Sequence, residues 1–473
     1  MWAERPSQPG SDGRHYDRAR MTIGLDVPRV SLSAEGREGP VYSSVRDRPS
    51  PDAAGNPQGP AGADAAAPAR LPRVHRNVLL LGVNSLLTDI SSESVNAVLP
   101  LYLTSVLGFT PLAFGFFDGV YQGMSAILRI FGGMFADRRQ RHKEVAGAGY
   151  ALSAACKVGL LASTTAVPTA GVLFLDRVGK GIRTAPRDAL ISLSSEPETM
   201  GESFGVHRAM DTVGAFIGPI VAFALLSYTN HAYDSVFVVS LCIAVLGLGV
   251  LAFFVQNPPK ERLEAARVQA LTRRGTRELL ANRAFRRIAV AGALLSLLTV
   301  SDAFIYLVYQ RHTHMTSRPF PLLFVGTALA YLLLAIPFGR LADRIGRAPV
   351  FLGGHVFLIG SYLALRGSGP GSGFLTIAAI LGGLGAYYAA TDGVLMALAS
   401  AVIPAELRSS GLAWLTTVTT AAKFAASLLF GLVWSWQGPD RAVSWFLIGL
   451  VGVFPIALLV LVRPSRREEV PAA

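Results

Sequence analysis

The chain has 473 residues, of which 51% are hydrophobic and only 16% are charged, and its mean hydropathy is +0.43. This composition excludes an ordinary soluble protein of that length. A net charge of +12 could indicate nucleic-acid binding, but the basic residues collect in short segments between long apolar blocks. The positive-inside rule predicts that distribution for a membrane protein, so we expect no nucleic-acid partner.

The first part of the chain, residues 1–72, is rich in Pro, Gly, Ala, Ser and Arg and shows no sustained apolar period. This composition predicts a disordered tail, which we expect on the cytoplasmic side. No apolar core follows a basic start, so we expect no signal peptide. Cys156 and Cys242 stand inside apolar runs and are expected to be free thiols.

From Val74 onward, apolar blocks of about 20 residues are each long enough to cross a hydrocarbon layer of roughly 30 Å as a helix. They predict an all-α integral membrane protein with twelve transmembrane helices in two six-helix bundles. The first bundle, over residues 73–256, contains spans near 77–107, 111–136, 145–166, 168–193, 205–228 and 232–255. The second bundle, over residues 287–463, contains spans near 287–309, 321–342, 348–366, 373–400, 410–435 and 442–462.

The segments between the spans predict the orientation in the membrane. Basic residues crowd the joints after spans two and eight and the C-terminal tail (464–473), whereas the joints after spans one and three carry none. The basic linker 257–286 either lies along the inner membrane surface or is solvated. An even number of spans then places both termini and the linker in the cytoplasm.

The first span carries two carboxylates on one helical face, because Asp89 and Glu93 are four residues apart. Ser85 and Asn96 extend this face into a polar stripe. Carboxylates at membrane depth usually face a partner or a water-filled cavity. Three roles remain open for the pair: proton carrier, ion pair with a basic residue of span four, and contact with a cationic substrate. Asp118, in span two, is a further proton-coupling candidate.

The fourth span concentrates six charged side chains between Asp176 and Asp188. Helical spacing places four of them on one face: Asp176, Lys180, Arg183 and Arg187. The three basic members of this face are candidates to line a substrate cavity. The charges are therefore predicted to lie on one membrane helix and not in a loop.

The fifth span opens with His207-Arg208-Ala-Met-Asp211, which adds Asp211 as a proton-coupling candidate and Arg208 as a substrate-cavity candidate. The second half carries isolated ionisable and aromatic residues inside its spans, and each is a further substrate-cavity candidate: Asp302, Tyr306, Tyr388, Asp392 and Lys423. Pairing of Lys423 with Asp392 as structure, and a packing role for the tyrosines, remain open.

An internal repeat relates the two halves. Gly133-Met-Phe-Ala-Asp137-Arg138 recurs as Gly339-Arg-Leu-Ala-Asp343-Arg344, and Ser85-Leu-Leu-Thr88 recurs as Ser296-Leu-Leu-Thr299. Echoes in the same order and at similar offsets indicate two homologous six-helix halves. The interface between such halves holds the substrate near the membrane midplane.

The second copy of the loop, Gly339 to Arg347, resembles the loop signature of the major facilitator superfamily, and the resemblance covers about residues 77–463. It implies that these loops latch the two halves together on the cytoplasmic face in the outward-facing state. The latch must break when the halves rock. The residues implied are Gly133, Asp137, Arg138, Gly339, Asp343, Arg344, Gly346 and Arg347.

Two further segments resemble that family's proton-driven exporters. Arg177-Val-Gly-Lys-Gly181 is similar to the span-four motif whose arginine is implicated in proton transfer, so Arg177 joins the proton-coupling candidates. Gly214-Ala-Phe-Ile-Gly218-Pro219 resembles part of the family's antiporter motif, although close helix packing explains its glycines equally well.

These features predict a secondary transporter in the cytoplasmic membrane, not an enzyme, that works by alternating access. Its expected partners are a small-molecule substrate, protons and membrane lipid, and proton-coupled efflux is the first choice. A proton-coupled transporter of an organic anion is the alternative, and a non-transporting membrane sensor is a third. Gly179-Lys180 does not complete a nucleotide-binding loop, because Phe174 and Gly181 occupy required positions. We expect a monomer without cofactor or metal.

Overall fold

The computed structural model describes residues 75–121, 123, 128, 136, 141–196, 199–229, 232–257, 281–404 and 407–462. The predicted N-terminal tail, most of the linker and the C-terminal tail lie outside these residues, as do Gly133, Asp137 and Arg138 of the predicted latch. Every regular element in the described ranges is a helix, which confirms the all-α fold.

Where the structure describes them, the helices of the first half follow the predicted spans closely. They are α1 (Arg76–Leu101), which continues into the π-helix η1 (Tyr102–Val106), a helix over residues 111–121, α3 (His142–Ala162), α4 (Ala166–Leu193), α5 (Met200–Tyr228) and α6 (Tyr233–Phe254). The charged segment of span four lies within α4, so its side chains project from a single helix. Pro186 is accommodated inside this helix.

The helices of the second half also match the predicted spans, with one exception at span seven. They are α9 (Arg283–Ser296), α10 (Asp302–Thr313), α11 (Pro321–Ile345), α12 (Arg347–Arg366), α13 (Phe374–Ser400), α14 (Arg408–Gln437) and α15 (Pro439–Val462). Span seven was predicted as one helix over 287–309, but it forms α9 and α10 with a break at residues 297–301.

The break in span seven is stabilised by a side chain from α12. The Tyr362 hydroxyl accepts a hydrogen bond from the backbone N–H of Val300 at 2.8 Å and donates one to the carbonyl of Leu298 at 3.0 Å. Tyr362 is fully buried, at 1% exposure. Interrupted helices are tolerated inside membrane proteins where such partners satisfy the freed backbone groups.

Eight of the described helices are long and apolar enough to cross a membrane by length and composition: α3, α5, α6, α11, α12, α13, α14 and α15. Three of the other spans fall short of these limits for identifiable reasons. α4 carries the charged segment, α9 and α10 are each half of a broken span, and α1 contains the polar stripe of Ser, Asn, Asp and Glu residues.

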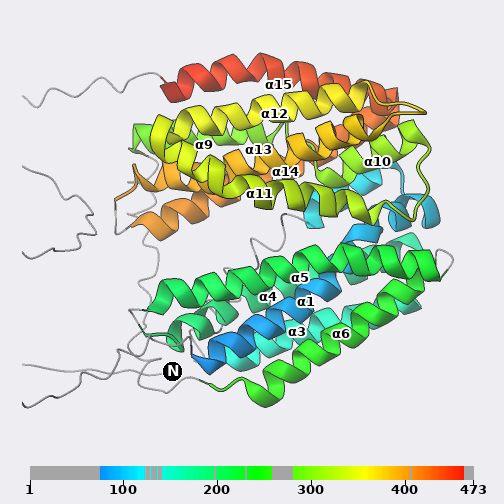
Figure 1. Cartoon of the computed structure of the whole chain (residues 1–473), viewed down its shortest axis with the longest axis vertical. Coiled ribbons are helices and arrows are strands. Elements are labelled where there is room, and N and C mark those ends of the chain that lie inside the picture. The colour runs from blue at the N-terminus through cyan, green and yellow to red at the C-terminus, as the bar shows by residue number, and fades with distance from the viewer. Residues whose placement is uncertain are drawn as a thin grey trace, which may run out of the picture. The chain divides into compact units, whose positions relative to one another are not determined.

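The two halves repeat the same helix pairings. In the first half α3 packs against α4 and α6, and α1 packs against α5 and α6. In the second half α12 packs against α13 and α15, and α9 packs against α14 and α15. Figure 1 shows these helices as two bundles, α1 to α6 in blue to green and α9 to α15 in green to red. The internal repeat of the sequence therefore corresponds to a repeat of packing.

The halves contact each other through backbone at glycines of the helix over residues 111–121 and of α14. A Cβ on Gly115 would collide with the carbonyl of Ser427, and one on Gly431 would collide with the carbonyl of Pro111. The N–H of Leu112 also donates to the Ser435 hydroxyl at 3.1 Å. We call this contact the glycine seam. A second contact between the halves joins α5 and α11.

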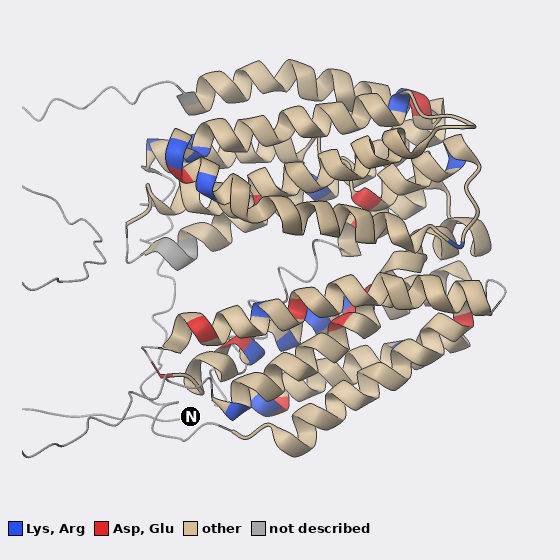
Figure 2. Ribbon diagram, viewed as in Figure 1, with Lys and Arg blue, Asp and Glu red and all other residues tan. Residues whose placement is uncertain are grey.

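Charge is distributed differently in the two halves. Figure 2 shows charged residues along the length of the helices in the α1–α6 bundle. In the α9–α15 bundle most of them gather near helix ends, with a few near the middle. Since charge inside a membrane bundle usually marks a functional site, the candidate site is sought between the charged helices of the first half and the few central charges of the second.

Candidate functional site

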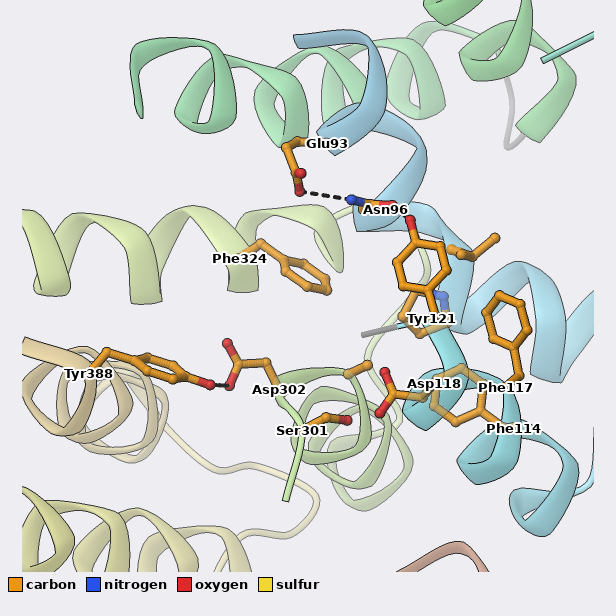
Figure 3. A pocket seen from close by; sticks show the side chains of 13 residues that line it. Glu93, Asn96, Phe114, Phe117, Asp118, Tyr121, Ser301, Asp302, Phe324 and Tyr388 are labelled. Carbon is orange, nitrogen blue, oxygen red and sulfur yellow. Dashed lines mark hydrogen bonds between the residues drawn. The ribbon is translucent and has the colours of Figure 1, made fainter. Parts of the chain in front are cut away.

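A cavity of about 270 Å³ lies between the two halves, lined by residues of both. Figure 3 shows the side chains that face it. Its described lining includes three carboxylates: Glu93, Asp118 and Asp302. Aromatic side chains supply much of the remaining wall: Phe114, Phe117, Tyr121, Phe324 and Tyr388.

The first half contributes a chain of hydrogen bonds to this cavity. The Asn96 amide donates to Glu93 Oε2 at 3.0 Å, and its carbonyl oxygen accepts from the Tyr121 hydroxyl. Lys180 Nζ lies 3.7 Å from Glu93 Oε1. Both side chains of this pair are only partly buried. An ion pair with a basic residue of span four was one role predicted for the carboxylates of span one, and Glu93 forms it. Glu93 also lines the cavity, where a substrate could contact it.

The other two carboxylates of the cavity are also held by hydroxyl groups. The Tyr388 hydroxyl donates to Asp302 Oδ1 at 2.7 Å. The Ser427 hydroxyl of α14 donates to Asp118 Oδ2 at 2.8 Å. Asp302 is the first residue of α10, so the break in span seven places its side chain at the cavity.

Behind the cavity, α4 carries a buried cluster of charges. Asp176 Oδ1 accepts from Lys157 Nζ of α3 at 2.9 Å, and Asp176 Oδ2 accepts from Arg177 at 2.6 Å. All three residues are at most 6% exposed. The Arg177 guanidinium covers the ring of Tyr121, with Cζ 3.9 Å from the ring centroid. Arg177 therefore reaches the cavity only through Tyr121, whose hydroxyl belongs to the chain described above.

The remaining arginines of α4 face partners inside the first half. Arg183 donates to the Ser153 hydroxyl at 3.0 Å and stacks on Tyr150, with 4.7 Å from Cζ to the ring centroid. Arg187 pairs with Asp188 at 3.0 Å. Neither guanidinium lines the cavity in the described structure, although both were predicted to do so.

A second carboxylate pair joins α1 to α5. The side chains of Asp89 and Asp211 lie close enough to influence each other electrostatically, and Asp89 Cβ would lie 3.2 Å from a Cβ on Gly214, one turn along α5 from Asp211. Asp211 Oδ1 also accepts from the Ser85 hydroxyl at 3.0 Å and lies 3.5 Å from Arg187. Arg208, predicted to line the cavity, instead lies 3.7 Å from Asp211 Oδ2. The proton-coupling candidates of spans one and five are thus brought together.

The glycines of span five let the two helices approach at this level. A Cβ on Gly214 would lie 3.2 Å from the Cβ of Asp89, and one on Gly218 would lie 2.8 Å from the backbone nitrogen of Ser94. Contacts below about 3.0 Å are essentially absent from real structures. The packing role predicted for these glycines is therefore confirmed, and the antiporter role stays a prediction.

The other candidates of the second half do not line the cavity in the described structure. Tyr306 is buried behind the cavity, where its hydroxyl pairs with Thr327 at 2.6 Å. Asp392 and Lys423 influence each other electrostatically, but in the described part of the chain they form no salt bridge within 4.0 Å, and neither lines the cavity.

The described half of the predicted latch lies at the joint of α11 and α12. Gly346 has a φ of 98°, which an L side chain rarely adopts, so glycine is required at this turn. Arg347 donates to the carbonyl of Ala397 at 2.8 Å. Asp343 and Arg344 are exposed and form no ion pair with any residue in the described ranges. The helix end that carries Gly339 precedes this turn.

Several residues of the site were not predicted from the sequence. Lys157, the partner of Asp176, could have been found as an ionisable residue inside an apolar helix. Tyr121, Phe324 and Ser301 carry no such signal, because an aromatic or hydroxyl residue in a membrane helix is ordinary. Across the described residues, no group of three His, Cys, Asp or Glu side chains is placed to hold a metal ion.

Comparison with known proteins gives consistent matches. The sequence matches the family model of the Major Facilitator Superfamily over residues 81–320 and 300–473. It is 29% identical over 391 residues, 82% of this chain and 94% of the relative, to an uncharacterised MFS-type transporter of Methanocaldococcus jannaschii. An uncharacterised protein of Mycobacterium tuberculosis is 36% identical over 159 residues, 33% of this chain and 38% of that protein.

Solved structures resemble the fold at low sequence identity. The nucleoside transporter NupG matches with a TM-score of 0.68 at 14% identity, over 82% of this chain and 100% of that one. A POT family transporter in complex with 5-aminolevulinic acid matches with a TM-score of 0.67 at 15% identity, over 81% of this chain and 96% of that one. At these identities the likeness concerns the fold alone.

Proposed function

The chain belongs to the major facilitator superfamily, and on that basis we propose that it exports a small molecule across the cytoplasmic membrane in exchange for protons. Membership makes it a multi-pass integral membrane protein and a secondary transporter of a small molecule, not an enzyme. The proposal concerns its coupling ion, its direction and the residues that carry the proton.

The close approach of the carboxyl groups of Asp89 and Asp211 at the contact of α1 with α5 carries the proposal. Two neighbouring carboxylates repel each other, and this repulsion favours a proton on one of them. Asp211 also accepts from Ser85 and faces Arg187, and both contacts favour its ionised form. We therefore assign the transported proton to Asp89.

Loss of this proton would act on the packing of α1 against α5. Gly214 and Gly218 hold the two helices in close contact at the level of the carboxyl pair. Release of the proton leaves two like charges side by side, which repel each other. The protonation state of Asp89 thus biases one helix contact, and a change of that kind can couple proton flow to rocking of the halves.

Export is the direction favoured by the sequence resemblances. Arg177 with Gly181, and Gly218 with Pro219, resemble segments of the family's proton-driven exporters. In this proposal Asp343, Arg344 and their counterparts in the first half act as the cytoplasmic latch of the outward-facing state.

Transport of an organic anion is the alternative function. The argument for it was that basic residues of spans four and five would line the cavity and bind the anion. Arg183 and Arg187 face Ser153 and Asp188, and Arg208 faces Asp211. Among the described residues that line the cavity, none is a lysine or an arginine. The geometry therefore favours the first proposal over an anion carrier.

Proton coupling is tested in inside-out membrane vesicles whose lumen is made acidic. The probe is the compound that most raises the melting temperature of the purified protein in a screen of a defined metabolite and drug panel. An exporter that exchanges protons accumulates this probe in the lumen, and nigericin, which collapses the pH gradient, abolishes the accumulation. Asp89→Asn should abolish gradient-driven accumulation while exchange of labelled for unlabelled probe continues.

Asp234→Asn is the matched control, because Asp234 is an exposed acid in the first turn of α6. It should accumulate the probe as the unmodified protein does. Accumulation that persists after the gradient has collapsed, or gradient-driven accumulation by Asp89→Asn, would contradict proton coupling through this carboxyl.

A further inference from the structure

The cavity between the halves has a distinctive chemical composition. Glu93, Asp118 and Asp302 line it, and the lining in the described part of the chain contains no cationic side chain. A ligand that enters it meets carboxylate oxygens and aromatic walls. An anionic group would therefore be placed against like charge, with no cation among the described lining residues to neutralise it.

Two basic residues of α4 near the cavity are already occupied. Lys180 lies 3.7 Å from Glu93, so it offsets part of the charge of that carboxylate. Arg177 is bound to Asp176 and is separated from the cavity by the ring of Tyr121. Asp302 differs from Glu93 in this respect, because its hydrogen-bond partner is the neutral hydroxyl of Tyr388 at 2.7 Å. Lys423 of α14 acts on Asp302 electrostatically but forms no salt bridge with it within 4.0 Å.

A polar group at the break in span seven is left without a partner. The Ser301 hydroxyl oxygen is shielded from solvent and forms no hydrogen bond with any described residue. It lines the cavity beside Asp302. A buried hydroxyl without a partner costs free energy unless a ligand or a water satisfies it. Ser301 and Asp302 together thus offer two oxygen acceptors to a donor in the cavity.

The aromatic residues form the complementary part of the site. Phe324 faces the cavity from α11, and Phe114 and Phe117 face it from the first half, as Figure 3 shows. Aromatic faces attract cations, and they also bury flat apolar surface. The volume of about 270 Å³ lies just below the usual range for ligand sites, which is about 300–1,000 Å³. The ligand is therefore compact.

We propose that this cavity binds a compact organic cation, a positively charged nitrogen on a flat apolar body, with the nitrogen at Asp302 and Ser301 and the body against the aromatic wall around Phe324. The proposal rests on the proposed function, because it names the chemical class of the cargo. Binding at Asp302 and proton transfer at Asp89 then involve different carboxylates, so the two can be tested separately.

Three probes of nearly the same shape and different charge test the proposal by calorimetric titration of the detergent-purified protein at neutral pH. 4-Phenylbenzylamine is a cation with N–H donors at this pH, 4-phenylbenzyl alcohol is its neutral counterpart, and biphenyl-4-carboxylate is the anion. We expect saturable binding of the cation, binding of the neutral probe about tenfold weaker, and no binding of the anion.

Two variants locate the binding site. Asp302→Asn should weaken binding of the cation about tenfold, because the charged partner of the nitrogen is lost. Phe324→Leu keeps an apolar side chain but removes the aromatic face, and should weaken it about threefold. Asp234→Asn is the matched control and should leave the affinity unchanged. Each variant is first checked for an unaltered melting temperature and elution volume.

The proposal is overturned if the cation does not bind, if the neutral or anionic probe binds as tightly, or if both variants retain full affinity for the cation. Transport of the cation in the acid-lumen vesicles separates the two proposals. Binding without gradient-driven accumulation would leave the cation site standing and contradict proton-coupled export. Gradient-driven accumulation of another panel compound, without binding of the cation, would do the reverse.

Discussion

Asp176 shows how individual charges are stabilised inside this bundle. Its carboxylate accepts from Lys157 and from Arg177 at 2.9 and 2.6 Å, and all three groups are buried. Burial of charge is costly unless each group is paired and hydrogen-bonded. One carboxylate here compensates two cations, so its removal would leave both of them without a counter-charge.

The first prediction concerns this cluster. Asp176→Asn should lower the free energy of unfolding by about 3–5 kcal/mol, the usual cost of removing one partner of a buried ion pair. The measurement is the melting temperature of the purified variant in detergent. Adding Lys157→Gln to the same variant should restore part of the loss, because one of the two uncompensated charges is then removed.

Asp234→Asn serves as the control for this experiment, since Asp234 is exposed and should tolerate the change. A melting temperature for Asp176→Asn equal to that of the unmodified protein would contradict the structural role of the cluster. If the double variant melts no higher than Asp176→Asn, the lost stability is assigned to the uncompensated charge of Arg177 alone.

At the residue scale, the sequence identified many of the charged groups but not their partners. The four-residue spacing of Asp89 and Glu93 predicted a shared helical face, yet Asp89 lies near Asp211 of α5, whereas Glu93 forms an ion pair with Lys180 of α4. Such differences depend on the rotation and level of neighbouring helices. No local pattern encodes these, so the sequence left several roles open for the same side chains.

At the scale of helices, the contact of α1 with α5 depends on two glycines. Gly218 faces backbone of α1, where a Cβ would lie 2.8 Å from the nitrogen of Ser94. Backbone cannot rotate aside as a side chain can, so the helices must separate to admit a methyl group. Overpacking of this kind usually costs about 1–3 kcal/mol.

The second prediction follows from this contact. Gly218→Ala should destabilise the protein by about 1–3 kcal/mol and reduce the proposed proton-driven transport, because it separates the helices that carry Asp89 and Asp211. Gly205→Ala, in the same helix, is the matched control, since nothing lies within 4 Å of a Cβ at that position. Equal melting temperatures for the two variants would show that the close approach has no energetic consequence.

The break in span seven illustrates what the sequence could not reveal at this scale. Residues 297–301 contain neither proline nor glycine, so no local signal ends the helix there. The hydrogen bonds that stabilise the break come from Tyr362 on another helix. A tertiary contact overrides local helix propensity here. Hydropathy alone therefore predicted one continuous span over 287–309.

At the scale of the whole described molecule, the sequence repeat predicted the architecture well. Recurrence of Gly133–Arg138 at Gly339–Arg344 indicated two related halves, and the same helix pairings recur in both. The composition of the cavity was not predictable, because Phe114, Asp302 and Tyr388 come from separate helices. Which side chains face the cavity depends on how the two halves pack against each other, and no local sequence pattern encodes that packing.

The two ends of the interface between the halves differ in the forces available to close them. α14 begins at the end of the bundle where α11 meets α12, and it ends at the opposite side, where the glycine seam joins Gly431 to Pro111. The seam consists mainly of backbone contacts between uncharged residues. The proposed latch at Asp343 and Arg344 consists of charged residues that are exposed in this structure.

Salt should therefore change the balance between the two closed forms, and this is the third prediction. Exposed ion pairs are screened by salt, whereas close packing is not. Raising the ionic strength should weaken the latch and increase the fraction of molecules with a closed seam. Cysteines at Leu112 and Ser435, whose backbone nitrogen and hydroxyl are 3.1 Å apart, should then form more cross-linked product. Both native cysteines are replaced by alanine for this measurement.

A cross-linking yield that falls as salt rises would contradict this assignment of forces. If the prediction holds, a contact between two glycine-bearing helices sets the conformation in which the transporter rests. One exit is closed by shape and the other by charge, so the resting orientation depends on the electrolyte around the protein even when no substrate is present.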